Sequence, residues 1–127
     1  MNTLIVAAPR GTSVKRFADL ARMHWAVRDE EPNHCLILEG LSHVILNADD
    51  SIGDDYDVND MALVRRVVPD PMFFLFESND IRFWKLVLAV LIDAEDVVVD
   101  DDHGSIVAGV EFARRLRSVT ACCGGEA

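Results

Sequence analysis

The sequence predicts a mixed α/β (α+β) fold, a single-domain sandwich in which about four helices pack against one mixed sheet of about five strands. Short apolar runs alternate with amphipathic segments along the chain, which gives the order β-α-β-β-α-β-α-β-α. No internal repeat or linker divides the 127 residues, of which 50% are hydrophobic. We therefore expect one globular domain over residues 1–120, followed by a flexible C-terminal tail over residues 121–127.

The chain is predicted to begin with a buried strand and an amphipathic helix. Residues 3–8 (TLIVAA) form a continuous apolar run, which is typical of a strand that is covered on both faces. Thr12 or Ser13 can cap the following helix. Apolar residues then recur at helical spacing over residues 14–25, so we expect about four turns.

A hairpin and an acidic loop are predicted next. Residues 34–39 and 43–46 form two apolar runs around a glycine, which favours an antiparallel pair. Residues 47–57 are polar and strongly acidic without periodicity, which indicates a solvated loop. Elsewhere, crossover helices favour parallel neighbours among the strands, so we expect a mixed sheet.

The second half of the chain continues the alternation. Asp57 or Asn59 can cap a short helix that prolines stop, and residues 72–76 (MFFLF) predict a buried strand. Asn79 or Asp80 can cap a largely buried helix that is predicted over residues 81–92. Residues 97–100 predict another strand, with which the next few residues can pair back before a final helix. These elements complete the predicted sandwich.

Composition and charge exclude several classes of protein. The 12 Lys and Arg residues against 22 Asp and Glu residues give a formal charge of −10, which argues against a basic nucleic-acid-binding face. The first nine residues lack a basic segment, and no apolar run reaches the roughly 20 residues that span a bilayer. The three cysteines form no disulfide framework. We expect a cytoplasmic protein that contacts no membrane.

Catalytic and metal-binding motifs are missing from the sequence. Gly11 stands alone where a phosphate-binding loop needs several glycines, and no G-x-S-x-G motif occurs. Residues 49–60 fail the calcium-loop pattern at its turn glycine, and the four histidines are too dispersed for a zinc site. We therefore expect no catalytic residue, no metal site, no cofactor and no enzymatic activity.

Two acidic clusters are the strongest candidates for a functional surface. One consists of Asp49, Asp50, Asp54, Asp55, Asp57 and Asp60, and the other of Asp93, Glu95, Asp96, Asp100, Asp101 and Asp102. Carboxylates that lie on one side of the molecule attract basic proteins over long distances, and basic nucleases are the obvious class of target. Tyr56 lies among the acids, and aromatic residues are enriched in protein interfaces. The predicted partner-binding residues are Asp54, Asp55, Tyr56, Asp57, Asp100, Asp101 and Asp102.

Two alternatives remain open. At strand periodicity, Asp100 and Asp102 lie on one face of the chain, and Asp101 and His103 lie on the other. Asp100 and Asp102, with His103 as an optional third residue, are a candidate magnesium site for phosphoryl transfer or hydrolysis. That chemistry also needs a cation for the phosphoryl group, and no motif supplies one. The second alternative is an acidic adaptor or regulatory subunit.

The stretches PDPMFFLFESND and VVVDDDHGSIVAGVEFARRL, within a small acidic chain, resemble parts of bacterial toxin-immunity proteins, particularly those of contact-dependent growth inhibition systems. The resemblance implies that the protein binds the C-terminal toxin domain of a large exported effector, often a tRNase or a DNase. It further implies neutralisation by covering the toxin's active site or an exosite. The resemblance assigns a role to no individual residue.

Overall fold

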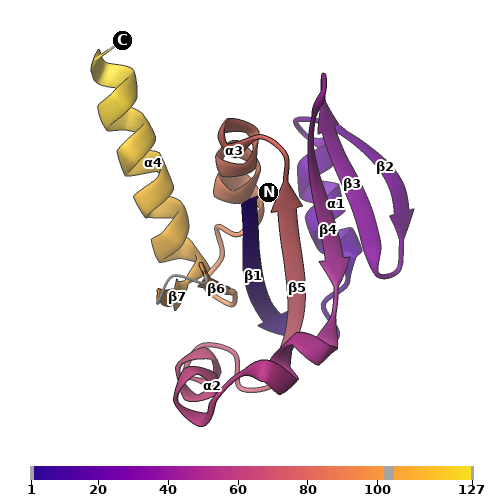
Figure 1. Cartoon of the computed structure of the whole chain (residues 1–127), viewed down its shortest axis with the longest axis vertical. Helices are drawn as coiled ribbons and strands as arrows, with labels where there is room; N and C mark the ends of the chain where they lie inside the picture. The colour runs from indigo at the N-terminus through magenta and orange to yellow at the C-terminus, as the bar shows by residue number, and fades with distance from the viewer. Residues whose placement is uncertain (1, 102–104, 127) are drawn as a thin grey trace.

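A seven-stranded antiparallel sheet forms the centre of the protein (Figure 1). The structure is a computed structural model that describes residues 2–101 and 105–126, with side chains up to residue 118. Its elements are β1 (Asn2–Pro9), α1 (Val14–Arg22), β2 (Ala26–Glu31), β3 (His34–Glu39), β4 (Ser42–Ala48), the 3-10 helix η1 (Asp50–Asp55), α2 (Val58–Arg65), β5 (Pro71–Ser78), α3 (Ile81–Leu91), β6 (Val98–Asp100), β7 (Ile106–Ala108) and α4 (Gly109–Glu126).

The strand order is β2-β3-β4-β5-β1-β6-β7, and every neighbouring pair runs antiparallel. The expectation of parallel neighbours was therefore wrong. Helix α3 does connect two strands of the same direction, β5 and β6, but β1 is inserted between them and runs opposite to both. Likewise, α1 connects β1 to β2, which lies at the far edge of the sheet. Same-direction strands thus never become neighbours in this part of the chain.

The predicted numbers of strands and helices also need correction. Helix α1 was expected over residues 14–25 but ends at Arg22. The residues that follow form the edge strand β2, which was not predicted. The alternation of apolar and polar residues did not predict this strand, because most of its side chains are charged and exposed, as is common at the edge of a sheet. A bulge between Arg28 and Glu31, with Asp29 at a φ of 54°, further disturbs its alternation.

Other predictions are confirmed. The hairpin β3–β4 turns at Gly40, whose φ of 60° favours glycine. Asp57 caps α2, and Asp80 caps α3 by accepting hydrogen bonds from the backbone N–H groups of Arg82 and Phe83 at 2.9 and 3.3 Å. Strand β7 pairs back on β6, as predicted. Residues 47–57 differ from the prediction of a loop, because they include the end of β4 and the short helix η1.

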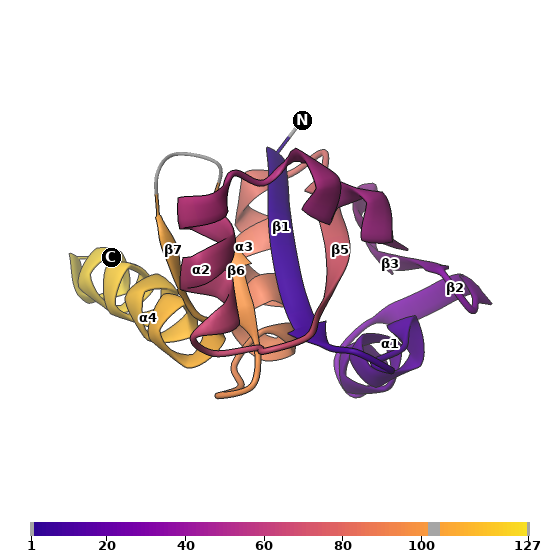
Figure 2. The ribbon, with the colours of Figure 1, turned by 90° about the horizontal axis from the view of Figure 1, so that it is seen from below.

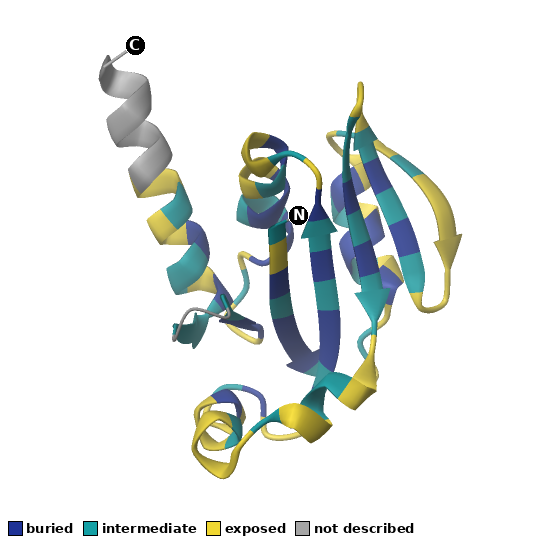
Figure 3. Ribbon diagram, viewed as in Figure 1, coloured by how far each residue is buried: buried dark blue, intermediate teal, exposed yellow. Residues whose placement is uncertain are grey.

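The two faces of the sheet are covered unequally. Helices α1, α3 and α4 cover one face and form the main core with it, and Figure 2 shows α1 and α4 at opposite ends of the molecule. On the other face, η1 and α2 cover a smaller core that includes Val64, Phe73 and Val98. The same face of β2, β3 and β4 carries no helix in Figure 1, and Figure 3 shows β2 exposed along much of its length. None of the described helices has the length and apolar character needed to cross a membrane.

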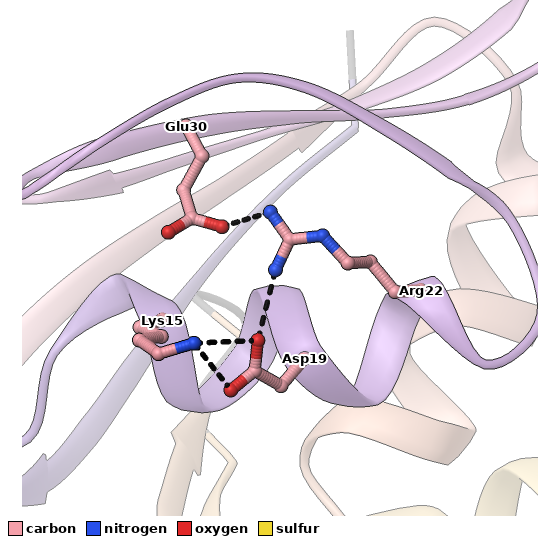
Figure 4. A network of polar contacts seen from close by, with 4 residues as sticks. All are labelled: Lys15, Asp19, Arg22 and Glu30. Atoms are coloured by element: carbon pink, nitrogen blue, oxygen red, sulfur yellow. Dashed lines mark hydrogen bonds and ion pairs between the residues drawn. The ribbon is translucent and has the colours of Figure 1, made fainter.

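Ion pairs fasten α1 to its neighbours. Figure 4 shows Asp19 accepting hydrogen bonds from Lys15 and Arg22 of the same helix, while Arg22 also pairs with Glu30 of β2. On the other flank of the helix, Arg16 pairs with Asp96 at 2.7 Å, in the connection between α3 and β6. Because these pairs are largely exposed, each contributes little to stability.

The aromatic centre of the main core yields a stability prediction. Phe17 is fully buried, and its ring makes edge contacts with Phe74 and Phe76 at centroid distances of 5.1 and 5.6 Å. We expect Phe17→Ala to lower the free energy of unfolding by about 3–5 kcal/mol in urea denaturation. The control Leu41→Ala changes a side chain that is 97% exposed and should shift it by less than about 0.5 kcal/mol. A loss below about 1 kcal/mol at Phe17 would contradict this placement of the core.

The Arg16–Asp96 pair predicts a pH dependence. Hydrogen bonds from Arg16 lower the pKa of Asp96 below its usual 3.8. A carboxyl group with a lowered pKa stabilises the fold above its unfolded pKa, and this stability is lost as the pH falls through the folded pKa. Asp96→Asn should therefore cost at most about 1 kcal/mol at pH 7, because the Asp96 side chain is 51% exposed.

Urea denaturation of wild type and Asp96→Asn over a range of pH values tests this expectation. The difference between their unfolding free energies should shrink toward zero as the pH falls below about 4. Glu95→Gln serves as the control, because Glu95 is exposed and has no ion-pair partner in the described part of the chain. A difference that stays constant with pH would refute the contribution of the pair.

Candidate protein-binding surface

The two predicted acidic segments meet at one hydrogen bond. The hydroxyl group of Tyr56 donates to Oδ2 of Asp100 at 2.5 Å, joining residues that are 44 positions apart in the sequence. Tyr56 follows η1, and Asp100 ends β6. This contact brings the acidic stretch before α2 next to the acidic end of β6.

Packing beneath η1 holds Tyr56 in this position. Its ring lies against Phe73 of β5, with a centroid distance of 5.2 Å and an interplanar angle of 43°. Gly53 lets η1 approach the same ring, because a Cβ atom at this position would lie 2.8 Å from Phe73 Cε2. Phe73 is 2% exposed and belongs to the smaller core, so it has little room to move. The acidic stretch is thus fixed to the sheet.

A hollow of about 350 Å³ lies beside the Tyr56–Asp100 hydrogen bond. Three carboxylates and two aliphatic side chains surround it. Carboxylates bind guanidinium and ammonium groups, while aliphatic walls suit the methylene stems of Arg and Lys. The hollow therefore has the chemistry to accept a basic side chain. The residues that line it are Ile5, Ile52, Asp55, Tyr56, Asp60 and Asp100.

Some of the predicted site residues accept hydrogen bonds from the protein's own backbone, whereas others do not. Asp57 caps α2 by accepting a hydrogen bond from the backbone of Asp60 at 2.7 Å, and Asp101 accepts one from the backbone of Ser105 at 3.1 Å. Asp54 and Asp55 are exposed, and in the described part of the chain their side chains have no hydrogen-bond or ion-pair partner. The carboxylates of Asp54 and Asp55 are therefore available to another molecule.

Some features of the surface differ from the sequence prediction. Tyr56 was expected as an aromatic anchor for a partner, whereas most of its ring packs into the protein. Ile5 and Ile52 were not recognised, since no local pattern in the sequence links β1 or η1 to an acidic site. Asp60 was recognised as part of the acidic stretch, and the structure adds that it lines the hollow. Asp102 lies outside the described residues.

The acidic residues between α3 and β6 do not join this surface. Asp96 pairs with Arg16, and Asp93 pairs with Arg117 of α4 at 3.1 Å. Both pairs involve helices that cover the main core. The negative surface is therefore formed by the stretch around η1 and the end of β6.

A second hollow, of about 570 Å³, runs along the outer flank of α2. Arg65 and Arg66 lie at one end of it, and neither side chain has an ion-pair partner among the described residues. The protein surface around α2 thus changes from acidic on the side of β6 to basic at the end of the helix. Its lining residues are Tyr56, Asp57, Val58, Met61, Ala62, Arg65 and Arg66.

Metal binding and thiol chemistry are two chemical alternatives to protein binding. Within the described ranges, no three His, Cys, Asp or Glu side chains converge as a metal site, and Asp102 and His103 of the candidate magnesium site lie outside those ranges. Burial raises the pKa of the Cys35 thiol to about 11, so this group stays protonated at neutral pH.

Comparison with protein-family models, curated proteins and solved structures gives no match to this chain.

The hydrogen bond between Tyr56 and Asp100 predicts an energetic coupling. In a double-mutant cycle of Tyr56→Phe and Asp100→Asn, the coupling free energy should be about 1–2 kcal/mol, since the hydrogen bond is partly buried and its acceptor is a carboxyl oxygen. Urea denaturation of the four proteins measures it. The control Asp54→Asn should change stability by less than about 0.5 kcal/mol. Additive effects of the two substitutions would show that the contact does not hold the acidic segments together.

Proposed function

We propose that this protein is an immunity protein that binds and neutralises a basic nuclease toxin domain. One observation carries the proposal. The Tyr56–Asp100 hydrogen bond gathers two acidic segments around a hollow that is lined by the carboxylates of Asp55, Asp60 and Asp100. A nuclease grips the phosphates of its substrate through cationic side chains, so an acidic surface is complementary to the same groups.

Electrostatics would guide the encounter of the two proteins. The chain carries a formal charge of −10, and Asp54 and Asp55 add exposed charge at the proposed contact, with no ion-pair partner among the described residues. Opposite charges accelerate association and orient the partners before they touch. Since neither residue supports the fold through a described side-chain contact, their charge is free to act on a partner.

The hollow would supply the specific contact. An Arg or Lys side chain from the toxin could place its methylene stem against Ile5 and Ile52 and its charged head among Asp55, Asp60 and Asp100. Arginine is one of the residues that dominate the binding energy of protein interfaces. Binding at this surface would neutralise the toxin by covering its active site or an exosite, without any chemistry from this chain. The proposed place of action is the cytoplasm, where such a nuclease meets its substrate.

Co-expression with the product of the neighbouring gene tests the proposed function. We expect the two proteins to purify together and this chain to restore growth of cells that express the toxin domain. A stable complex without growth rescue would favour the alternative of an adaptor or regulatory subunit. If no toxin gene lies nearby and no basic nuclease domain binds, the proposal is wrong.

The association rate gives a residue-level prediction. Asp54→Lys combined with Asp55→Lys should slow association with the toxin domain by about tenfold or more at low salt, and should reduce the dependence of the rate on ionic strength. Stopped-flow fluorescence measures both quantities. The fold should persist, because neither side chain has a described partner.

A matched control changes the same number of charges elsewhere. Glu39 and Glu95 are exposed and have no ion-pair partner in the described residues, so Glu39→Lys combined with Glu95→Lys alters the net charge equally. The control should slow association much less than the test variant does. Equal effects of the two variants would mean that only the overall charge of the protein matters and that the proposed surface is wrong.

A further inference from the structure

The uncovered half of the sheet presents an unusual group of aliphatic side chains. On the face that carries η1 and α2, the strands β3, β4 and β5 expose parts of Leu36, Leu38, Ile45 and Leu75. None of these four side chains belongs to either core cluster. In Figure 1 no helix lies over this face of β2, β3 and β4. We call this area, together with Leu75 and Glu77 of the adjoining strand β5, the open face. Contiguous aliphatic side chains that the fold leaves uncovered indicate an interaction surface.

One row across the open face has a charge at each end. Pairing places Arg28 beside Leu36, Leu36 beside Ile45, and Ile45 beside Glu77. The row thus reads cation, apolar, apolar, anion across the strands from β2 to β5. In the described part of the chain, neither Arg28 nor Glu77 has an ion-pair partner. Glu77 is partly buried in the sheet, where a carboxylate without a partner is unfavourable.

We propose that the open face binds a second copy of this chain, face to face. A two-fold axis parallel to the strands, between β3 and β4, would place Arg28 over the second copy's Glu77. By symmetry it would place Glu77 over the second copy's Arg28, and Leu36 over the second copy's Ile45. Each copy then supplies the partner that the other lacks, which is the self-complementarity that a two-fold interface requires.

The neighbouring rows are compatible with this arrangement. In the row on one side, Ala26, Leu38 and His43 pair across β2, β3 and β4, so Leu38 would face the second copy's His43. In the row on the other side, His34 and Asn47 lie beside each other with their side chains 2.8 Å apart. No pair of like formal charges would meet on β3 and β4. A strongly basic partner fits less well, because the row carries as many cations as anions.

The size of the open face predicts a weak dimer. Four strands about 4.8 Å apart and six residues long, at about 3.4 Å per residue, give a projected area of roughly 400 Å² per copy. A stable complex buries about 800 Å² per partner, so association in the micromolar range is expected. The shoulder formed by η1 and α2 would lie beyond the second copy's edge strand.

Charge exchange tests the proposal with the full chain alone. Sedimentation velocity from about 10 µM to about 500 µM should show concentration-dependent dimers for the wild type. Arg28→Glu and Glu77→Arg, each alone, should weaken the dimer at least about tenfold, because each places like charges opposite one another. The double variant Arg28→Glu/Glu77→Arg should restore it. An equimolar mixture of the two single variants should also dimerise, since one then carries two carboxylates where the other carries two guanidinium groups.

Lys85→Glu is the matched control. It changes the charge as Arg28→Glu does, but Lys85 is an exposed residue of α3, on the opposite side of the sheet. This variant should dimerise like the wild type, and circular dichroism should show that every variant is folded. A wild type that stays monomeric at every concentration would overturn the proposal. So would single variants that dimerise normally, or a failure of both the double variant and the mixture to restore association. The toxin-binding proposal does not enter this experiment and would survive its failure.

Discussion

The pairing of β1 with both β5 and β6 is the constraint on which the rest of the structure depends. All eight residues of β1 pair with β5, and its other edge pairs with β6. This insertion separates β5 from β6 and makes the sheet antiparallel throughout. It also places Ile5 beside Asp100 on one side and beside Leu75 on the other. Ile5 of β1 therefore lines the acidic hollow, and the open face begins on the neighbouring strand β5.

Unequal coverage of the sheet gives its second face two different surfaces. The chain between β4 and β5 folds back as η1 and α2 over one half of this face, and it carries the acidic stretch with it. The hairpin β3–β4 and the edge strand β2 receive no cover there. The acidic surface is strongly negative, and its hollow has a small apolar part. The open face is aliphatic and has balanced charges. Partners of opposite kinds would suit these two surfaces.

Local sequence patterns predicted the elements that depend on local physics. The run before Pro9, the hairpin at Gly40 and the caps at Asp57 and Asp80 follow from burial, turn geometry and backbone hydrogen bonding within a few residues. The edge strand β2 was missed because an exposed edge needs few apolar residues. The expectation of parallel neighbours was wrong because the insertion of β1 between β5 and β6 is decided by contacts between distant segments, and for the same reason no strand order could be predicted.

In the candidate surface, too, local sequence predicted some features, whereas others depend on contacts between distant segments. Acidic composition pointed to Asp54, Asp55 and the end of β6, because charge density is visible in any window of sequence. The hydrogen bond from Tyr56 to Asp100 joins segments 44 residues apart, and neither segment contains a signal for the other. Ile5 enters the hollow only through the register of β1 with β6. The acidic residues could therefore be predicted from the sequence, whereas the hollow that they line depends on pairing between distant segments.

The two proposed interactions respond to salt in opposite ways, which separates them physically. Each copy carries a formal charge of −10, so two copies repel each other at long range, and added salt screens this repulsion. The Arg28–Glu77 pairs of a face-to-face dimer would be partly covered, and covered pairs are screened much less than exposed charges. Attraction between the acidic surface and a basic toxin is long-range and loses strength as salt is added. Self-association should thus gain from ionic strength under the same conditions in which toxin capture slows.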